Sequence, residues 1–156
     1  MFDPEEYFES LEKAISVSNC RSWAQVTGPG PEYPQIELDR FRQWAVIMWR
    51  FEVIFPGHGI LKAIESHSRT KNRSHLRKIS YHFMDENKGL IFRVDSHQTQ
   101  IPFGDCPHLD PGPRGAPRIE EGDPRLVDNS LKDFDFLRMW DWVLDYISNR
   151  RVPWQR

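Results

Sequence analysis

The sequence is poor in several features, each of which would indicate a particular class of protein. It has only two cysteines, Cys20 and Cys106, which are too few for a disulfide scaffold. Its longest nearly apolar run, residues 44–49, is far shorter than the ~20 residues that cross a bilayer. The first residues, Met-Phe-Asp-Pro-Glu-Glu, are acidic, whereas a secretory leader begins with basic residues. The sequence therefore predicts a cytoplasmic protein that does not bind a membrane.

An excess of one charge is also absent. The chain has 21 Lys and Arg against 23 Asp and Glu, which argues against a generic nucleic-acid coat protein, although a local basic patch is compatible with it. What is abundant is bulky apolar surface, with ten Phe, six Trp and four Tyr among 156 residues. This length and composition predict a single folded domain over residues 1–156.

Apolar residues recur at helical spacing near both ends of the chain. Asp3-Pro4-Glu5-Glu6 combines a cap residue, a first-turn proline and a glutamate three residues after the cap, and an apolar stripe follows as far as Asn19. A second stripe runs from Ser130 to Asn149. We expect one helix at each of these places.

Between the predicted helices, the sequence alternates as strands do. Alternate residues from Phe41 to Phe55 are apolar, which predicts one long or bent strand, with a buried helix as the rival assignment. Pro56-Gly57-His58-Gly59 predicts a turn, and Ile60 to Ile64 a short returning strand.

The clearest element is a β-hairpin over residues 78–95, where two alternating segments flank the turn sequence Asp-Glu-Asn-Lys-Gly. Pairing Met84 with Gly89, and so Phe83 with Leu90, places all the apolar side chains on one face. These are Ile79, Tyr81, Phe83, Leu90, Phe92 and Val94. The opposite face then carries Ser80, His82, Ile91, Arg93 and Asp95.

Residues 98–129 contain six prolines and no sustained period, which predicts a long loop that is either functional or ordered only with a partner. The predicted fold is therefore α+β: a mainly antiparallel sheet around the 78–95 hairpin, covered by the N-terminal and C-terminal helices.

Cationic, acidic and imidazole groups gather at the end of this hairpin. Arg93 and Asp95 are two residues apart on a strand, so they share a face, and His82 belongs to the same predicted face. His97 and His108 would reach it if the loop folds back. Arg93 would bind a phosphate, Asp95 would orient an imidazole, and His97 or His108 would act as general acid or base. The alternative is a surface ion pair among ordinary polar histidines.

A metal site is a second possibility at the same place. His97, Asp105, His108 and Asp110 are all residue types that ligate metals, but their spacing matches no zinc signature. We therefore predict a mechanism without a metal or another cofactor. A nucleophilic role for Cys106 is weaker still, because it requires a low pKa that the sequence does not demonstrate.

Positive charge is concentrated in residues 62–78. The segment has a single carboxylate, and its Ser, Thr and Asn residues suggest an exposed loop. Such a patch beside the polar face of the hairpin would suit a phosphate backbone, so its later members, with His82, are candidate substrate-binding residues. These are Lys71, Arg73, Arg77 and Lys78. The alternative is a loop whose charges only face solvent.

The segment Leu90-Ile-Phe-Arg-Val-Asp-Ser-His97, with the later pair Pro107-His108, resembles the small TumE-like toxins of prokaryotic toxin–antitoxin modules. In that family a hairpin ends in an Arg-x-Asp motif, which a His-containing bend and a Pro-His pair follow. The resemblance spans roughly residues 78–110 and implies that Arg93, Asp95, His97 and His108 are the functional positions. It also implies a helix-turn-helix antitoxin as the partner.

Together these features predict a toxin-like protein that acts on RNA or another phosphate-bearing target, with a metal-independent endoribonuclease as the specific form. The alternative is a non-enzymatic interaction module. In that case Trp140, Trp142 and Trp154, with the Pro-rich loop, would form an exposed surface for a partner protein.

Overall fold

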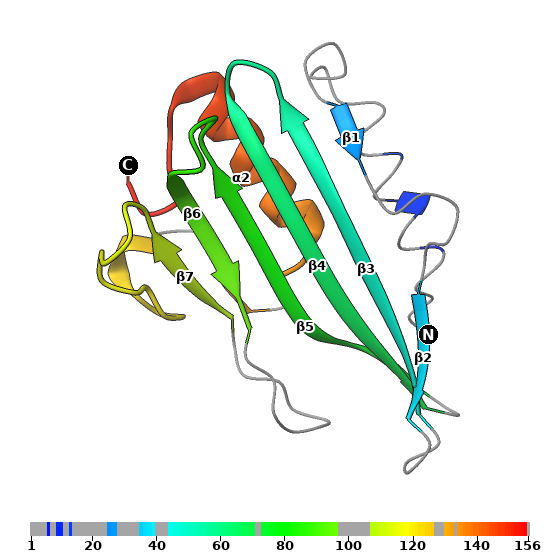
Figure 1. Ribbon diagram of the computed structural model, residues 1–156. Helices are drawn as coiled ribbons and strands as arrows, with labels where there is room; N and C mark the ends of the chain where they lie inside the picture. Colours follow the sequence, from blue (N-terminus) through cyan, green and yellow to red (C-terminus); the bar gives the residue numbers. More distant parts are fainter. Residues whose placement is uncertain are drawn as a thin grey trace.

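A computed structural model shows an antiparallel sheet with a helix across one face (Figure 1). The structure describes residues 6, 9–10, 13, 25–27, 35–39, 44–70, 73–96, 107–126, 130–132 and 134–155. Within these residues the predicted α+β class is confirmed. At the N-terminus, Glu6, Glu9, Ser10 and Lys13 have helical backbone, and Ser10 Oγ donates to Glu6 O at 2.9 Å. The rest of that predicted helix, and its packing on the sheet, lie outside the described residues.

Seven strands form the sheet within the described part of the chain. They are β1 Gln25–Thr27, β2 Gln35–Asp39, β3 Trp44–Phe55, β4 Gly59–Thr70, β5 Arg73–Met84, β6 Leu90–Asp95 and β7 His108–Pro111. Their order is β1-β3-β4-β5-β6-β7, and β2 also pairs with β3. Consecutive strands from β3 to β7 are therefore neighbours in the sheet, and each pair is antiparallel.

The β3–β4 hairpin confirms the long strand predicted before residue 56 and rules out the helical alternative. The turn falls where predicted, with His58 N donating to Phe55 O at 2.9 Å. Gly59 ends it at a φ of +150°, and a Cβ there would lie 2.2 Å from the carbonyl oxygen of Met84, so only glycine fits. The returning strand β4 runs to Thr70 and has 12 residues, more than twice the predicted five.

The prediction of an exposed basic loop within residues 62–78 is wrong. These residues continue β4 and begin β5, paired from Ile60↔Met84 to Thr70↔Arg73 with an irregularity between Ser66 and His67. Backbone pairing on both edges of β4 holds this polar segment in the sheet, although it lacks an alternating apolar face. Arg73, Arg77 and Lys78 are on β5, and Lys71 lies outside the described residues.

The hairpin of residues 78–95 is confirmed as β5 and β6, but its register differs from the prediction by two residues. Met84 pairs with Leu90 instead of Gly89, and Asp85 N donates to Gly89 O at 2.8 Å within the turn. The register then shifts again at Ile91, so that Phe83 pairs with Phe92. Two single-residue shifts restore the parity of a strand, so the predicted division into two faces holds from Phe92 to Asp95. It is wrong at Ile91, which was predicted on the polar face and packs against the core.

The predicted 98–129 loop is partly structured. Residues 108–111 form β7, Ile119 bridges back to Leu109, and residues 124–126 form a short 3₁₀ helix, η2 (Pro124–Leu126). A loop prediction for these residues is wrong because each strand-like piece is too short to show a period. Residues 97–106 and 127–129 lie outside the described part of the chain.

The C-terminal helix, α2, spans Phe136–Asn149 and starts six residues later than predicted. Asp135 caps it, with Oδ1 accepting from Arg138 N at 3.1 Å, and Arg150 ends it in the left-handed region at a φ of 55°. Leu131 and Phe134 precede the helix but are buried, which explains why the apolar spacing extends too far. No helix among the described residues is long and apolar enough to span a bilayer.

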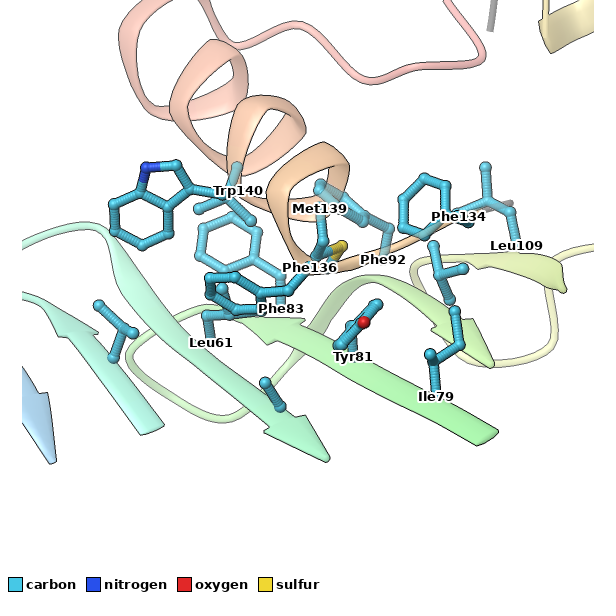
Figure 2. Close-up of a cluster of buried hydrophobic side chains, with 14 of the residues drawn as sticks. Leu61, Ile79, Tyr81, Phe83, Phe92, Leu109, Phe134, Phe136, Met139 and Trp140 are labelled. Carbon is cyan, nitrogen blue, oxygen red and sulfur yellow. The ribbon is translucent and has the colours of Figure 1, made fainter. Parts of the chain in front are cut away.

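The hydrophobic core lies between α2 and one face of the sheet (Figure 2). Aromatic rings dominate it: Phe83 and Phe92 have centroids 5.5 Å apart, as do Phe55 and Trp140. The predicted exposed tryptophan surface is wrong. Trp140 is buried, Trp142 packs against Phe134 at 4.7 Å, and Trp154 packs against Phe92 at 5.9 Å. Ile64 is the one large hydrophobic residue with an exposed side chain among the residues whose side chains the structure describes.

Candidate functional site

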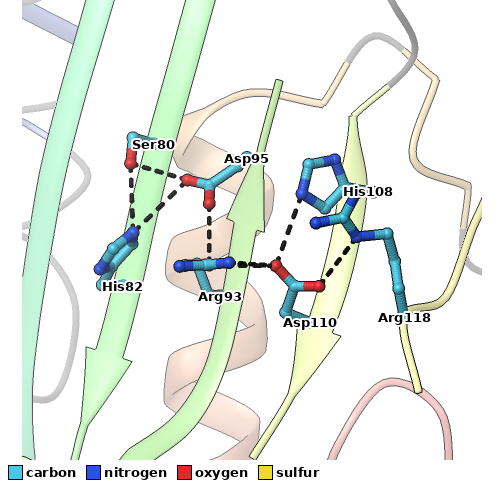
Figure 3. Close-up of polar contacts among 7 residues, drawn as sticks. All are labelled: Ser80, His82, Arg93, Asp95, His108, Asp110 and Arg118. Carbon is cyan, nitrogen blue, oxygen red and sulfur yellow. Dashed lines mark hydrogen bonds and ion pairs between the residues drawn. The ribbon is translucent and has the colours of Figure 1, made fainter. Parts of the chain in front are cut away.

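The face of the sheet away from α2 carries a cluster of polar and charged side chains at its β5–β6–β7 end (Figure 3). We call it the charge cluster, and it consists of Ser80, His82, Arg93, Asp95, His108, Asp110 and Arg118. The register places them in two neighbouring rows across the strands. One row pairs His82 with Arg93 and Arg93 with Asp110. The other pairs Ser80 with Asp95 and Asp95 with His108.

Arg93 is the centre of the charge cluster. Its Nε lies 2.8 Å from Asp95 Oδ2, and its Nη2 donates to Asp110 Oδ2 at 2.5 Å. The hydrogen bond from Arg93 to Asp110 raises the pKa of the guanidinium above its ordinary value, although burial opposes the shift. Arg93 is therefore a permanent cation held between two carboxylates on adjacent strands.

Asp95 is buried, and its carboxylate orients the side chains beside it. Its Oδ1 accepts from Ser80 Oγ at 2.7 Å and lies 3.4 Å from His82 Nε2, while Ser80 Oγ is also 3.2 Å from that nitrogen. Burial alone would raise the pKa of Asp95, but hydrogen bonds from His82 and Ser80 and the charge of Arg93 outweigh it, so the pKa is lowered. Asp95 is thus a buried carboxylate that stays ionised.

His82 is the accessible imidazole of the charge cluster. Its side chain is 35% exposed, whereas the Asp95 side chain that contacts it is 9% exposed. An imidazole that faces solvent, with one nitrogen held by a buried carboxylate, has the arrangement of a general base. The sequence placed His82 on the correct face but assigned it only to substrate binding.

Asp110 accepts from arginines on both sides. The Leu109↔Ile119 bridge brings residue 118 beside β7, and Arg118 Nε donates to Asp110 Oδ1 at 3.0 Å. Burial would raise the pKa of Asp110, but the hydrogen bonds from Arg93 and Arg118 prevail and lower it. Sequence reasoning missed Arg118. The available signal was an isolated apolar residue, Ile119, flanked by charges in the Pro-rich segment.

His108 lies in the charge cluster as predicted, but its side chain is buried. Its Nε2 is 3.5 Å from Asp110 Oδ2. That burial removes it as the accessible general acid or base and leaves it as a neighbour of the carboxylates. The fourth predicted catalytic residue, His97, lies outside the described residues.

Of the Lys and Arg residues predicted to bind substrate, only Lys78 has a described side chain, and it is not part of the charge cluster. Lys78 is exposed on β5, and the backbone positions of Arg73 and Arg77 are further along the same strand, away from the β5–β6 turn. Lys62 is closer: the register places it opposite His82, and its Nζ lies 3.6 Å from Glu52 Oε2.

Three residues of the charge cluster could hold a metal ion. Ligand atoms of Asp95, His108 and Asp110 all lie within 4.8 Å of one another. Two of the four ligands considered from the sequence, His108 and Asp110, are thus brought together, while His97 and Asp105 lie outside the described residues. Arg93 contacts both carboxylates, so a divalent ion would compete with the guanidinium for the same oxygens.

Comparison with protein-family models, with curated proteins and with solved structures finds no match to this chain. The chemistry of the charge cluster is therefore argued from its geometry. It combines an accessible imidazole, a buried orienting carboxylate and two partly exposed guanidinium groups. That set can remove a proton from a hydroxyl group and bind an oxyanion beside it.

Proposed function

We propose that the protein is a toxin-like enzyme of a toxin–antitoxin module and that it cleaves RNA without a metal ion. The observation that supports this proposal best is the contact between His82 and Asp95 next to Arg93. It supplies a base, the carboxylate that orients the base, and a cation for a phosphate on adjacent strands. The helix-turn-helix antitoxin and the cytoplasmic location belong to the same proposal.

The proposed reaction begins at His82. With Nε2–H directed at Asp95, Nδ1 is the basic nitrogen and takes the proton of a ribose 2′-hydroxyl. The 2′ oxygen then attacks the phosphorus, and Arg93 stabilises the charge that develops on the phosphate oxygens. The bond from phosphorus to the 5′ oxygen breaks, this oxygen takes a proton from water, and the remaining hydroxide takes the proton held by His82. The products are a 2′,3′-cyclic phosphate and a 5′-hydroxyl.

The test is cleavage of single-stranded RNA by purified full-length protein, together with growth of a bacterial host after controlled induction. His82→Gln should lower the cleavage rate by about 10²–10⁴-fold, the usual contribution of a general base, and should abolish growth arrest. His58→Gln is the matched control, since His58 is in the β3–β4 turn and is not part of the charge cluster. Both variants must unfold cooperatively on heating.

Two results would contradict the proposal. Loss of cleavage in EDTA, restored by a divalent ion, would replace the metal-free mechanism with one based on Asp95, His108 and Asp110. Unimpaired growth and uncut RNA with soluble wild-type protein would reject the enzyme and favour the interaction module. Equal loss in His82→Gln and His58→Gln would assign the effect to general damage.

A further inference from the structure

We infer that Arg93 and Arg118 form a binding site for a phosphate-type oxyanion and that the Asp110 carboxylate is its resident anion. The two arginines approach Asp110 from opposite sides. Arg93 pairs with Asp110 across β6 and β7, and the Leu109↔Ile119 bridge places Arg118 on the other side of β7. The backbone therefore fixes the separation of the two cations.

The contacts show how this site would recognise an oxyanion. Arg93 uses Nε and Nη2 on Asp110 Oδ2, at 3.1 and 2.5 Å, and Arg118 uses Nε on Oδ1 at 3.0 Å. Both oxygens of one carboxylate thus accept from a guanidinium. A phosphate accepts hydrogen bonds from planar guanidinium groups as a carboxylate does. The donor arrangement that binds Asp110 therefore also suits a phosphate.

Exposure favours entry from solvent. The side chains of Arg93 and Arg118 are 34% and 46% exposed, while that of Asp110 between them is 15% exposed. The terminal nitrogens of Arg118 and Nη1 of Arg93 make no hydrogen bond to any residue that the structure describes. An incoming oxyanion can therefore form its first hydrogen bonds before the carboxylate leaves.

The inference rests on the proposed function only for the source of the phosphate. His82 is opposite Arg93 on β5, so a phosphate bound by Arg93 would lie next to the proposed base. If RNA is not the substrate, the same chemistry would bind inorganic phosphate or a small phosphate ester. Separate measurements with inorganic phosphate and with a 2′-O-methyl RNA, which cannot be cleaved by 2′-hydroxyl attack, distinguish these sources.

The experiment is titration of the full chain with each of these two probes by calorimetry. Arg118→Gln should weaken binding by about tenfold, the effect of one charge-assisted hydrogen bond. Its control, Arg125→Gln, removes the same charge from a guanidinium that pairs with Asp123 alone among the described residues. Asp110→Asn should strengthen binding by about tenfold, because the competing anion is gone. Its control, Asp145→Asn, makes the same charge change on α2.

The outcomes separate cleanly. Parallel changes with both probes would support an RNA phosphate, and binding of inorganic phosphate alone would support the site while removing support from the proposed function. Weaker binding in Asp110→Asn would overturn the inference, since Asp110 would then hold the arginines in place for the ligand. Equal effects of Arg118→Gln and Arg125→Gln would also overturn it. The inference would also be overturned if the wild-type protein bound Mn²⁺ through Asp110 and bound no phosphate.

Discussion

The two faces of strands β4, β5 and β6 are built from alternate residues of the same segments, yet their chemistry is opposite. Toward α2 the strands present Leu61, Ile79, Phe83 and Phe92, all buried. Away from α2, β5 and β6 present residues of the charge cluster, in which even the buried side chain of Asp95 is ionised. The first face provides apolar burial, the main favourable term in folding. The second requires desolvation of charges, which ion pairing only partly offsets.

The difference indicates where the sequence is constrained by folding and where by another role. Replacing buried ion pairs with apolar residues of similar size is often neutral or stabilising. A core alone would therefore not require Asp95, Arg93 and Asp110 in contact. Their contact on a sheet face with partly exposed guanidinium groups is better explained by binding or catalysis, which is the basis of the proposals above.

One residue breaks the division between the faces. Glu65 is on the α2 side and completely buried, where it accepts a hydrogen bond from Tyr81 Oη. Asp135, the cap of α2, has a raised pKa, chiefly because of burial and in part because of the nearby Glu65.

The largest expected effect tests the two faces with one residue type. Ile79→Ala should lower the free energy of unfolding by about 2–5 kcal/mol, because it leaves a cavity under α2. Ile64 has a 38% exposed side chain on the other face, so Ile64→Ala should cost less than about 1 kcal/mol. Urea unfolding at neutral pH measures both. Equal losses would show that the face away from α2 is also packed.

The next effect concerns the exception on the core face. Tyr81→Phe should lower the free energy of unfolding by about 1–3 kcal/mol, since the buried Glu65 carboxylate loses a donor. Tyr146→Phe is the matched control, because Tyr146 packs its ring on Phe83 and Phe92 and is only half-buried. We expect it to change stability by less than about 0.5 kcal/mol. Similar values for both variants would remove any special role for the Tyr81–Glu65 contact.

Local periodicity was sufficient to predict much of the fold. The strand ending at Phe55, the hairpin of residues 78–95 and the C-terminal helix all have strong apolar patterns, and each is present. The basic segment was misassigned because its strands are held by pairing on both sides, which a sequence window does not show. The start of α2 was misplaced because buried residues in an extended segment continue its apolar spacing.

The candidate site was predictable only where it depends on strand parity. Arg93, Asp95 and His82 share a face because they alternate on the hairpin, and a register error of two residues leaves that unchanged. The proximity of His108 was anticipated, but its burial was not, since burial depends on tertiary packing. Arg118 was missed because a single bridge in a Pro-rich segment brings it to Asp110.

The smallest effect compares two carboxylates whose pKa values shift in opposite directions. The pKa of Asp95 is lowered, so its contribution to stability is present above its unfolded pKa, near the ordinary value of 3.8, and is lost as pH falls through the folded value. The pKa of Asp135 is raised, so its contribution is present below that unfolded pKa and is lost as pH rises through the folded value. Acid therefore weakens the fold through Asp95 and opposes that loss through Asp135.

Urea unfolding at several pH values from 3 to 7 should show this difference. Asp95→Asn should reduce the loss of stability on acidification, and Asp135→Asn should increase it, while asparagine preserves the cap of α2. Each slope should change by no more than about 1.4 kcal/mol per pH unit, the limit for one proton. If both variants change the slope in the same direction, the pKa values of Asp95 and Asp135 are not shifted in opposite directions. A slope that neither variant changes would assign the acid dependence to other carboxylates, of which Asp110, with its two arginines, is the first to replace.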